Sequence, residues 1–79
     1  MRIDKYLKIS RIIKRRTVAQ EACDGGKVLI NDKTAKPSSE VKIGDRITLT
    51  FGAKKITIEV LLVKETVRKD EAELLYRQI

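Results

Sequence analysis

Three adjacent cations, Lys14, Arg15 and Arg16, are the residues whose types and spacing point most directly to chemistry. A guanidinium can bind a phosphate through two parallel hydrogen bonds, and adjacent cations can reach several phosphates along a bent strand. Thr17 follows as a predicted helix N-cap, so the run precedes a helix N-terminus, which itself attracts anions. The run therefore predicts a phosphate-binding segment with Arg16 as its main determinant. The alternative is an ordinary solvated charge run.

Further cations recur before and after that run. Arg2, Lys5 and Lys8 are three residues apart in a predicted helix, so they form either its solvated side or part of a contact with a polyanion. We assign Arg2 and Lys8 to the contact and leave Lys5 undecided. Arg11 either packs its stem on a sheet or reaches the partner, and we favour the partner. Lys36 is the best candidate beyond the second predicted helix.

The net charge of +7 on 79 residues also indicates a polyanionic partner. The charge is uneven, because residues 1–27 carry a net +5 and residues 28–79 only +2. The N-terminal third is therefore the expected contact face. No stretch is long and apolar enough for a transmembrane helix, and charges follow Met1 at once. We expect no membrane association and a cytoplasmic location.

The composition removes several kinds of catalytic and metal chemistry. The chain has no histidine and one cysteine, Cys23, so it cannot assemble a Ser-His-Asp triad or a cage of cysteine and histidine ligands. Its four glycines are not arranged as a phosphate-binding loop. A lone cysteine also fits a reducing compartment, with Cys23 as a small core residue. We expect neither an enzyme nor a bound cofactor or metal.

Two helices position the cations. The first spans about residues 2–9, and Asp4 within it is expected to orient a neighbouring arginine. The second begins at Thr17, with Gln20 completing a capping box in preference to binding the partner, and it ends at Gly25-Gly26. Tyr6 is assigned to the edge of the core, as is Tyr76 near the end of the chain, in preference to a base-stacking role.

Strands follow the helices. A short strand at residues 28–30 leads into a turn at 31–33, and residues 47–51 alternate between apolar and polar as a half-buried strand does. A connection at 52–55 joins that strand to a second one at 56–60. Asp70 and Glu73 are expected to cap a short terminal helix, and its apolar side would be formed by Ala72, Leu75, Tyr76 and Ile79. The fold class is therefore α+β, with two short N-terminal helices on a small antiparallel sheet and a short C-terminal helix.

The order of these residues resembles the alpha-L RNA-binding motif of the small-subunit ribosomal protein four family. The matching segments are RIDKYL (2–7), SR (10–11), KRRTVA (14–19), GKVLIN (26–31), AKPS (35–38) and VKIGDRI (41–47). The similarity covers roughly residues 2–50, within a single predicted RNA-binding domain of residues 1–79 whose extra hairpin and tail span 51–79. One departure is Asp32, which occupies a turn position where the family often has glycine.

The added hairpin and the tail EAELLY (71–76) resemble the heat-shock-protein-fifteen group, from which we expect a stand-alone domain with no fused catalytic domain. Residues 5–17 are most similar to the RqcP group of ribosome-associated quality control P-site factors. That resemblance implies binding to a large ribosomal subunit obstructed by nascent chain-tRNA. The chain would contact rRNA and stabilise peptidyl-tRNA during C-terminal alanine tailing, beside an RqcH-type tailing factor, and it would be a monomer.

The motif, rather than the charge, favours RNA over DNA. The expected RNA-binding residues are Arg2, Lys8, Arg11, Lys14, Arg15, Arg16 and Lys36. Two alternatives are a generic module for structured RNA and a detached accessory domain of an rRNA-modifying enzyme. The generic module would bind any RNA hairpin alike, and the accessory domain would require a separate catalytic chain.

Overall fold

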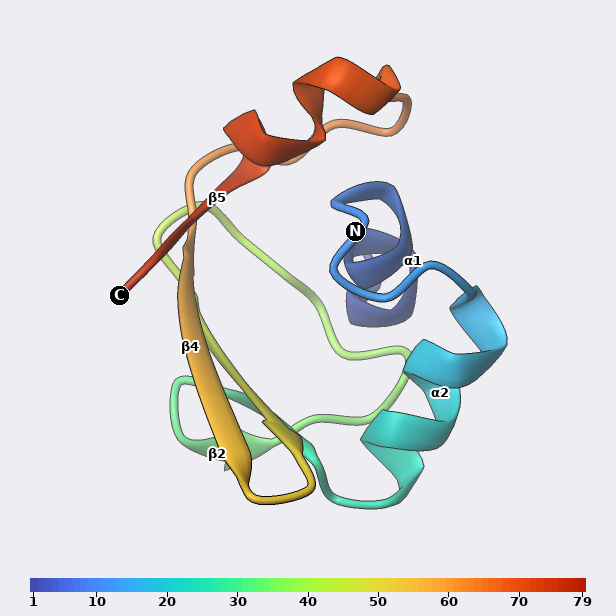
Figure 1. Cartoon of the computed structure of the whole chain (residues 1–79), viewed down its shortest axis with the longest axis vertical. Helices are drawn as coiled ribbons and strands as arrows, with labels where there is room; N and C mark the ends of the chain where they lie inside the picture. The colour runs from blue at the N-terminus through green and yellow to red at the C-terminus, as the bar shows by residue number, and fades with distance from the viewer.

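Two short helices pack against one side of an antiparallel sheet in the computed structural model, which describes all 79 residues (Figure 1). The helices are α1 (Ile3–Ile9) and α2 (Arg16–Asp24). The strands are β1 (Val28–Ile30), β2 (Lys33–Thr34), β3 (Arg46–Phe51), β4 (Lys54–Val60) and β5 (Tyr76–Gln78), and a 3-10 helix, η1 (Lys69–Leu75), precedes β5. The predicted α+β class is confirmed. Neither α-helix is long or apolar enough to cross a bilayer.

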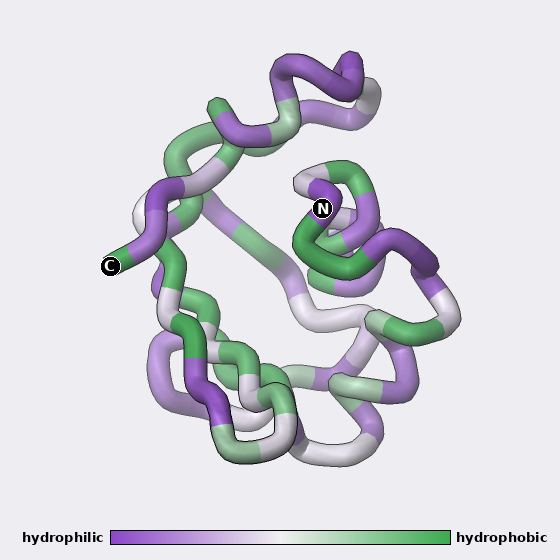
Figure 2. The backbone as a smooth tube through the Cα atoms, viewed as in Figure 1, coloured by the Kyte–Doolittle hydropathy of each residue, from purple (hydrophilic) through white to green (hydrophobic).

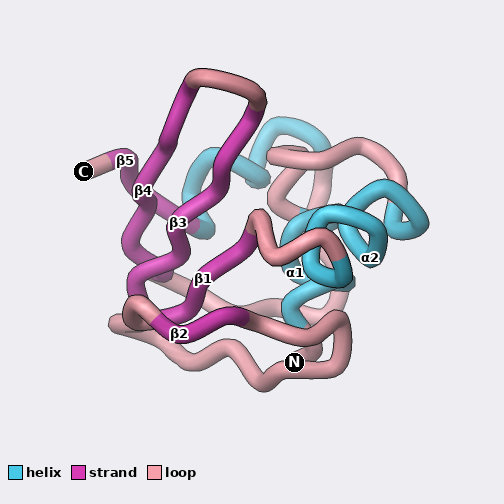
Figure 3. The backbone as a smooth tube through the Cα atoms, turned by 90° about the horizontal axis from the view of Figure 1, so that it is seen from below, coloured by secondary structure: helices cyan, strands magenta, loops and turns pink.

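The five strands form one sheet in the order β2-β1-β3-β4-β5, with every neighbouring pair antiparallel (Figure 3). The core lies between this sheet and α1, which contributes Ile3, Tyr6 and Leu7, all fully buried. Ile47 and Leu49 of β3 face them, as the alternating pattern predicts. Figure 2 shows the resulting contrast, with apolar segments in α1 and the central strands and a strongly hydrophilic segment leading into α2.

Phe51 is an exception to the predicted half-buried strand. It follows Ile47 and Leu49 in the alternation, yet 43% of its surface is exposed. The reason is the short partner strand, because β1 pairs with β3 only as far as Leu49. Phe51 therefore lies beyond the covered part of the sheet.

The predicted β3–β4 hairpin and the predicted turn after β1 are both present, and each turn has two residues, so Lys33 already belongs to β2. Asn31 and Asp32 join β1 to β2 with φ angles of 50° and 68°, the positive pair that a type I′ turn requires. Gly52 and Ala53 join β3 to β4, and only Gly52 has a positive φ, 58°, as in a type II′ turn. The β3–β4 connection is thus shorter than predicted, because Lys54 and Lys55 already belong to β4.

The predicted capping box of α2 is wrong. The helix begins at Arg16, with Arg15 as an extended N-cap residue, and no side chain caps it. Thr17 therefore already has helical geometry and cannot act as the cap. Gln20 instead donates a hydrogen bond to the Asp4 carboxylate, a buried anion that needs donors. The predicted end of the helix is confirmed, with Gly26 in the left-handed region at φ 73°.

The predicted cap of the terminal helix is also wrong. The 3-10 helix η1 starts after Arg68, so Arg68 rather than Asp70 is the N-cap. The Arg68 N–H donates a hydrogen bond to Glu71 Oε1 at 3.2 Å, and Glu71 therefore makes the bond expected of Glu73. The helix ends at Leu75, and the chain continues as β5 along β4.

This ending has a physical cause in the core. The Leu75 carbonyl accepts the Tyr6 hydroxyl at 2.7 Å and the backbone N–H of Leu61 at 2.8 Å. It therefore cannot continue a helical ladder in the usual way. Tyr76 belongs to the strand and Ile79 follows it, so neither lies on a helix face, while Tyr6 is fully buried rather than at the core edge. Burial raises the pKa of the Tyr6 phenol well above its usual value.

Candidate nucleic-acid interface

A fully buried carboxylate, that of Asp4 in α1, lies at the centre of the cationic face. It accepts hydrogen bonds from the N–H of Lys5 at 2.7 Å, Gln20 Nε2 at 3.0 Å, Arg2 Nη2 at 3.2 Å and Arg16 Nη2 at 3.4 Å. A buried anion is tolerated only when it is paired and hydrogen-bonded in this way. One side chain thus fixes two guanidinium groups that come from different helices. The expected role of Asp4, orienting an arginine, is confirmed.

The environment of Asp4 keeps it ionised. Burial on its own raises the pKa of this carboxyl, but the hydrogen bonds from Gln20, Arg16 and the Lys5 N–H outweigh burial and lower the pKa below its usual value. At neutral pH the group is therefore a carboxylate. Its charge holds the guanidinium groups of Arg2 and Arg16 and offsets only part of their combined positive charge.

Arg2 and Arg16 keep much of their surface for a partner. Their side chains are 50% and 40% exposed, whereas Asp4 between them is 0% exposed. The buried Nε of Arg16 lies 3.3 Å from Asp4 Oδ2 as an ion pair, but at an angle that leaves it without a hydrogen bond. The contacts to Asp4 therefore orient each guanidinium without using all of its donors. An oriented guanidinium of this kind is suited to bind a phosphate.

The N-terminus of α2 adds to this surface. Its first turn contains no acidic residue and no side-chain cap, so its first N–H groups are left for solvent or an anion. Arg15 at the N-cap and Lys14 before it are both exposed, and neither forms an ion pair. The three adjacent cations thus surround a helix start, as the sequence predicts, but Arg16 is inside the helix.

The loop that carries Lys36 lies against the start of α1. Backbone N–H groups of Ile3 and Asp4 donate to the carbonyls of Ser39 at 2.8 Å and Pro37 at 3.3 Å. The Lys36 N–H in turn donates to Ser39 Oγ at 2.8 Å, which shapes the loop. Lys36 itself is exposed. Segments far apart in the sequence therefore bring Lys36 to the end of α1 at which Arg2 lies.

The remaining cations differ in how they are compensated. Lys5, left undecided from the sequence, forms an ion pair with Glu65, which neutralises its charge locally. Lys8 is exposed in the last turn of α1 and has no acidic partner. Arg11 is exposed just after the helix and has a positive φ of 62°, a region that non-glycine residues rarely adopt. Lys8 and Arg11 thus extend the unpaired positive charge beyond α1.

A family model for the S4 domain matches residues 1–47, which include both helices, β1 and the Lys36 loop. The chain belongs to the S4-domain family. The predicted resemblance to this family is confirmed.

The most informative relatives have one shared name. A protein of Halalkalibacterium halodurans named "RQC P-site tRNA stabilizing factor" is 53% identical over 96% of this chain and 86% of its own length. The protein of that name from Bacillus subtilis is 51% identical over 96% and 88%. Among solved structures, the trimeric structure of Vibrio cholerae Heat Shock Protein 15 matches with a TM-score of 0.92 at 40% identity, covering 100% of this chain and 81% of the other.

Two features of this S4 domain escape a reading of the sequence alone. The first is the hydrogen bond from Gln20 to Asp4, because a capping box already explains Gln20 locally. The pattern that could have shown it is helical spacing, since Gln20 is four residues after Arg16 and three before buried Cys23 and so lies on the face toward α1. Phe51 is the second, since the alternation assigns it to the core. The contacts unite Arg2 and Arg16 through Asp4, while no ion pair or hydrogen bond links Lys8, Arg11 or Lys14 to them.

Proposed function

We propose that this chain is an RNA-binding factor of ribosome-associated quality control. It binds large ribosomal subunits obstructed by nascent chain-tRNA, contacts their rRNA and stabilises peptidyl-tRNA during C-terminal alanine tailing. Membership of the S4-domain family and the name shared by relatives 46–53% identical over nearly the whole chain support this function. The observation that carries the proposal is the pair of half-exposed guanidinium groups, Arg2 and Arg16, oriented by one buried carboxylate.

The Arg2–Asp4–Arg16 arrangement binds a partner and does not catalyse a reaction. Guanidinium groups that are held in place recognise the spacing of phosphates along the RNA backbone. A folded RNA can then be bound by its shape, with few contacts to its bases. The exposed side chains of Lys8, Arg11, Lys14, Arg15 and Lys36 would extend the contact along the RNA. On this proposal the chain acts as a non-catalytic monomer in the cytoplasm, with rRNA and peptidyl-tRNA as its partners and an RqcH-type tailing factor beside it.

Co-sedimentation with isolated large subunits tests the proposal. Wild type, Arg16→Ala, Arg16→Lys and Arg77→Ala are each mixed with subunits that carry or lack peptidyl-tRNA. We expect wild type to bind best when peptidyl-tRNA is present and Arg16→Ala to lose this binding. Arg16→Lys should be intermediate, because it keeps the charge but not the bidentate geometry. Arg77→Ala is the matched control, since Arg77 lies in β5 and pairs with Glu59, and β5 is away from α1 and α2 (Figure 1).

Circular dichroism must first show that each variant is folded, because Arg16→Ala removes one of several donors to Asp4. The proposal is wrong if wild type and Arg16→Ala bind every subunit equally and bind bulk RNA as well. A generic RNA-binding module would give that result. Loss of binding by Arg77→Ala to the same extent would show that net charge, and not the Asp4-oriented pair, determines affinity.

A further inference from the structure

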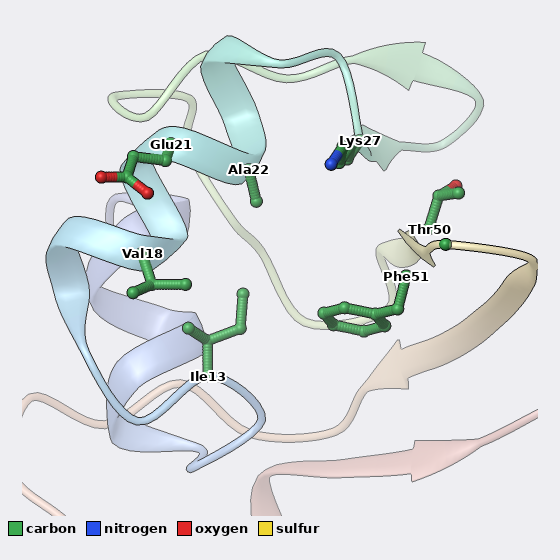
Figure 4. A pocket seen from close by; sticks show the side chains of 8 residues that line it. Ile13, Val18, Glu21, Ala22, Lys27, Thr50 and Phe51 are labelled. Carbon is green, nitrogen blue, oxygen red and sulfur yellow. The ribbon is translucent and has the colours of Figure 1, made fainter.

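An open groove lies between α2 and the end of the β3–β4 hairpin, away from the Asp4 cluster. Its volume is about 330 Å³, within the usual range of small-ligand sites. One wall consists of Ile13, Val18 and Ala22, and Phe51 faces them across the groove (Figure 4). The polar groups at its edges are Glu21, Lys27 and Thr50.

The apolar walls are exposed although the core beside them is closed. Val18 is 44% exposed and Phe51 is 43% exposed, whereas Ile13 in the same wall as Val18 is only 6% exposed. Phe51 cannot pack more deeply, because β3 has no β1 partner beyond Leu49. The hairpin therefore holds an aromatic ring at the surface, opposite an aliphatic wall on α2.

The charges around the groove indicate what it binds. Lys27 lies in the groove, and Lys54 and Lys55 are directly across the β3–β4 ladder from Phe51 and Thr50. None of these lysines pairs with an acidic side chain. An apolar peptide would fit the walls but would leave these cations unused. A second copy of a chain with a net charge of +7 would meet like charges.

An unpaired nucleotide of RNA matches both the walls and the charges. Its base has flat apolar faces that stack on aromatic rings, and its phosphates are anions. The carboxylate of Glu21 points away from Phe51 (Figure 4), so it does not oppose a phosphate at Lys27.

We propose that this groove receives one unstacked nucleobase of the bound RNA, stacked on Phe51 with an adjacent phosphate at Lys27. The inference rests on the proposed function, which supplies the bound RNA. It adds a contact with one base to the contacts with phosphates at the other cations. The same helix supports both regions, because Arg16 begins α2 and Ala22 lies about 9 Å farther along its axis at 1.5 Å per residue. One RNA strand can therefore reach both.

The test uses two RNA hairpins with the same stem, one with a single bulged adenosine and one with an abasic site at that position. Fluorescence anisotropy measures the affinity of each variant for both. We expect wild type to prefer the adenosine hairpin about tenfold, the usual effect of one base–aromatic stack. Phe51→Ala and Phe51→Leu should both abolish the preference, because neither presents a ring. Leu74→Ala is the matched control, since Leu74 is an exposed apolar residue (64%) on η1.

The outcomes separate this inference from the proposed function. Arg16→Ala should weaken binding to both hairpins and leave their ratio unchanged. If wild type binds both hairpins equally, or if Phe51→Ala lowers both affinities alike, the base site is wrong while RNA binding stands. If neither hairpin binds, the base site is wrong, and co-sedimentation with large subunits decides the proposed function separately. A dimer seen by sedimentation that Phe51→Ala dissociates would assign the groove to self-association and also overturn the base site.

Discussion

Asp4 places a negative charge where the folded chain excludes water, so its contribution to stability should depend on pH. Its pKa is lowered in the folded state, hence its contribution is present above the unfolded value near 3.8 and is lost as pH falls through the folded value. At neutral pH, Asp4→Asn should lower the free energy of unfolding by about 1.5–3 kcal/mol, the usual effect of hydrogen bonds to a charged group.

Urea unfolding followed by circular dichroism at several pH values measures this effect. The difference in free energy of unfolding between wild type and Asp4→Asn should be largest above about pH 5. It should shrink toward about pH 3 and below, because protonated Asp4 is uncharged, as asparagine is. A difference that is the same at every pH would mean that Asp4 acts through packing and not through its charge.

Arg11 shows a conflict between stability and binding at one residue. Its φ of 62° follows the end of α1, where helices often place a glycine in the left-handed region. An arginine there costs stability, and its exposed side chain makes no ion pair in return. We therefore expect Arg11→Gly to keep or raise the melting temperature while it weakens RNA binding several-fold. Thermal unfolding and anisotropy on the same sample measure both, and a fall in melting temperature without a change in affinity would assign Arg11 to folding.

Among the elements, the β1–β2 turn is the one that a single change should improve. Asn31 and Asp32 both have positive φ, and the type I′ turn favours glycine at the second of these positions. Asp32 is exposed and makes no side-chain hydrogen bond, whereas Asn31 donates to Asp45. Asp32→Gly should therefore raise the free energy of unfolding by up to about 1 kcal/mol.

That gain corresponds to an increase of up to about 4–8 °C in melting temperature for a domain of this size. Differential scanning calorimetry measures it, with Asp70→Gly as a control at an exposed position whose φ is not positive. A lower melting temperature for Asp32→Gly would show that the extra conformational entropy that glycine loses on folding outweighs the relief of backbone strain in the turn.

Elements were predictable where one local pattern decided them. The alternation in residues 47–51 and 56–60 has a period of two, so the hairpin followed, although its turn is two residues shorter than the predicted connection at 52–55. The tail was ambiguous, because Ala72 and Leu75 are three residues apart and share a face in a 3-10 helix as well as in an α-helix. Its end at Leu75 depends on Tyr6, sixty-nine residues away, which no local pattern contains.

The site followed the same division. The role of Asp4 was predictable, because an acidic residue between Ile3 and Leu7 of an apolar helix face needs a cationic partner. The role of Gln20 was not, since a capping box satisfies it locally and only the packing of α2 on α1 offers the alternative. Local rules therefore identified the charges, and tertiary contacts determined which of them are held in place.

Over the whole molecule, the net positive charge is uneven, with +5 on residues 1–27, which include both α-helices, and +2 on residues 28–79. The helices and the Lys36 loop carry cations that are mostly unpaired, whereas Arg77 in β5 is paired with Glu59 across the sheet. Arg46 also lies opposite Glu59 in the β3–β4 register. On the proposed function, this uneven charge would turn the helical side toward RNA before any contact forms.

The salt dependence of RNA binding measures how many of these charges are used. If about five phosphates are contacted, the logarithm of affinity should fall with the logarithm of salt concentration at a slope of about −3.5 to −4.5 between roughly 50 and 200 mM salt. Arg16→Ala should reduce the magnitude of that slope by about one, because it removes one phosphate contact. Phe51→Ala should lower affinity for the bulged hairpin at every salt concentration without changing the slope, since a stacked base releases no counterion. An unchanged slope for Arg16→Ala would show that Asp4 keeps Arg16 for the fold and that the phosphates are bound by the unpaired cations around it.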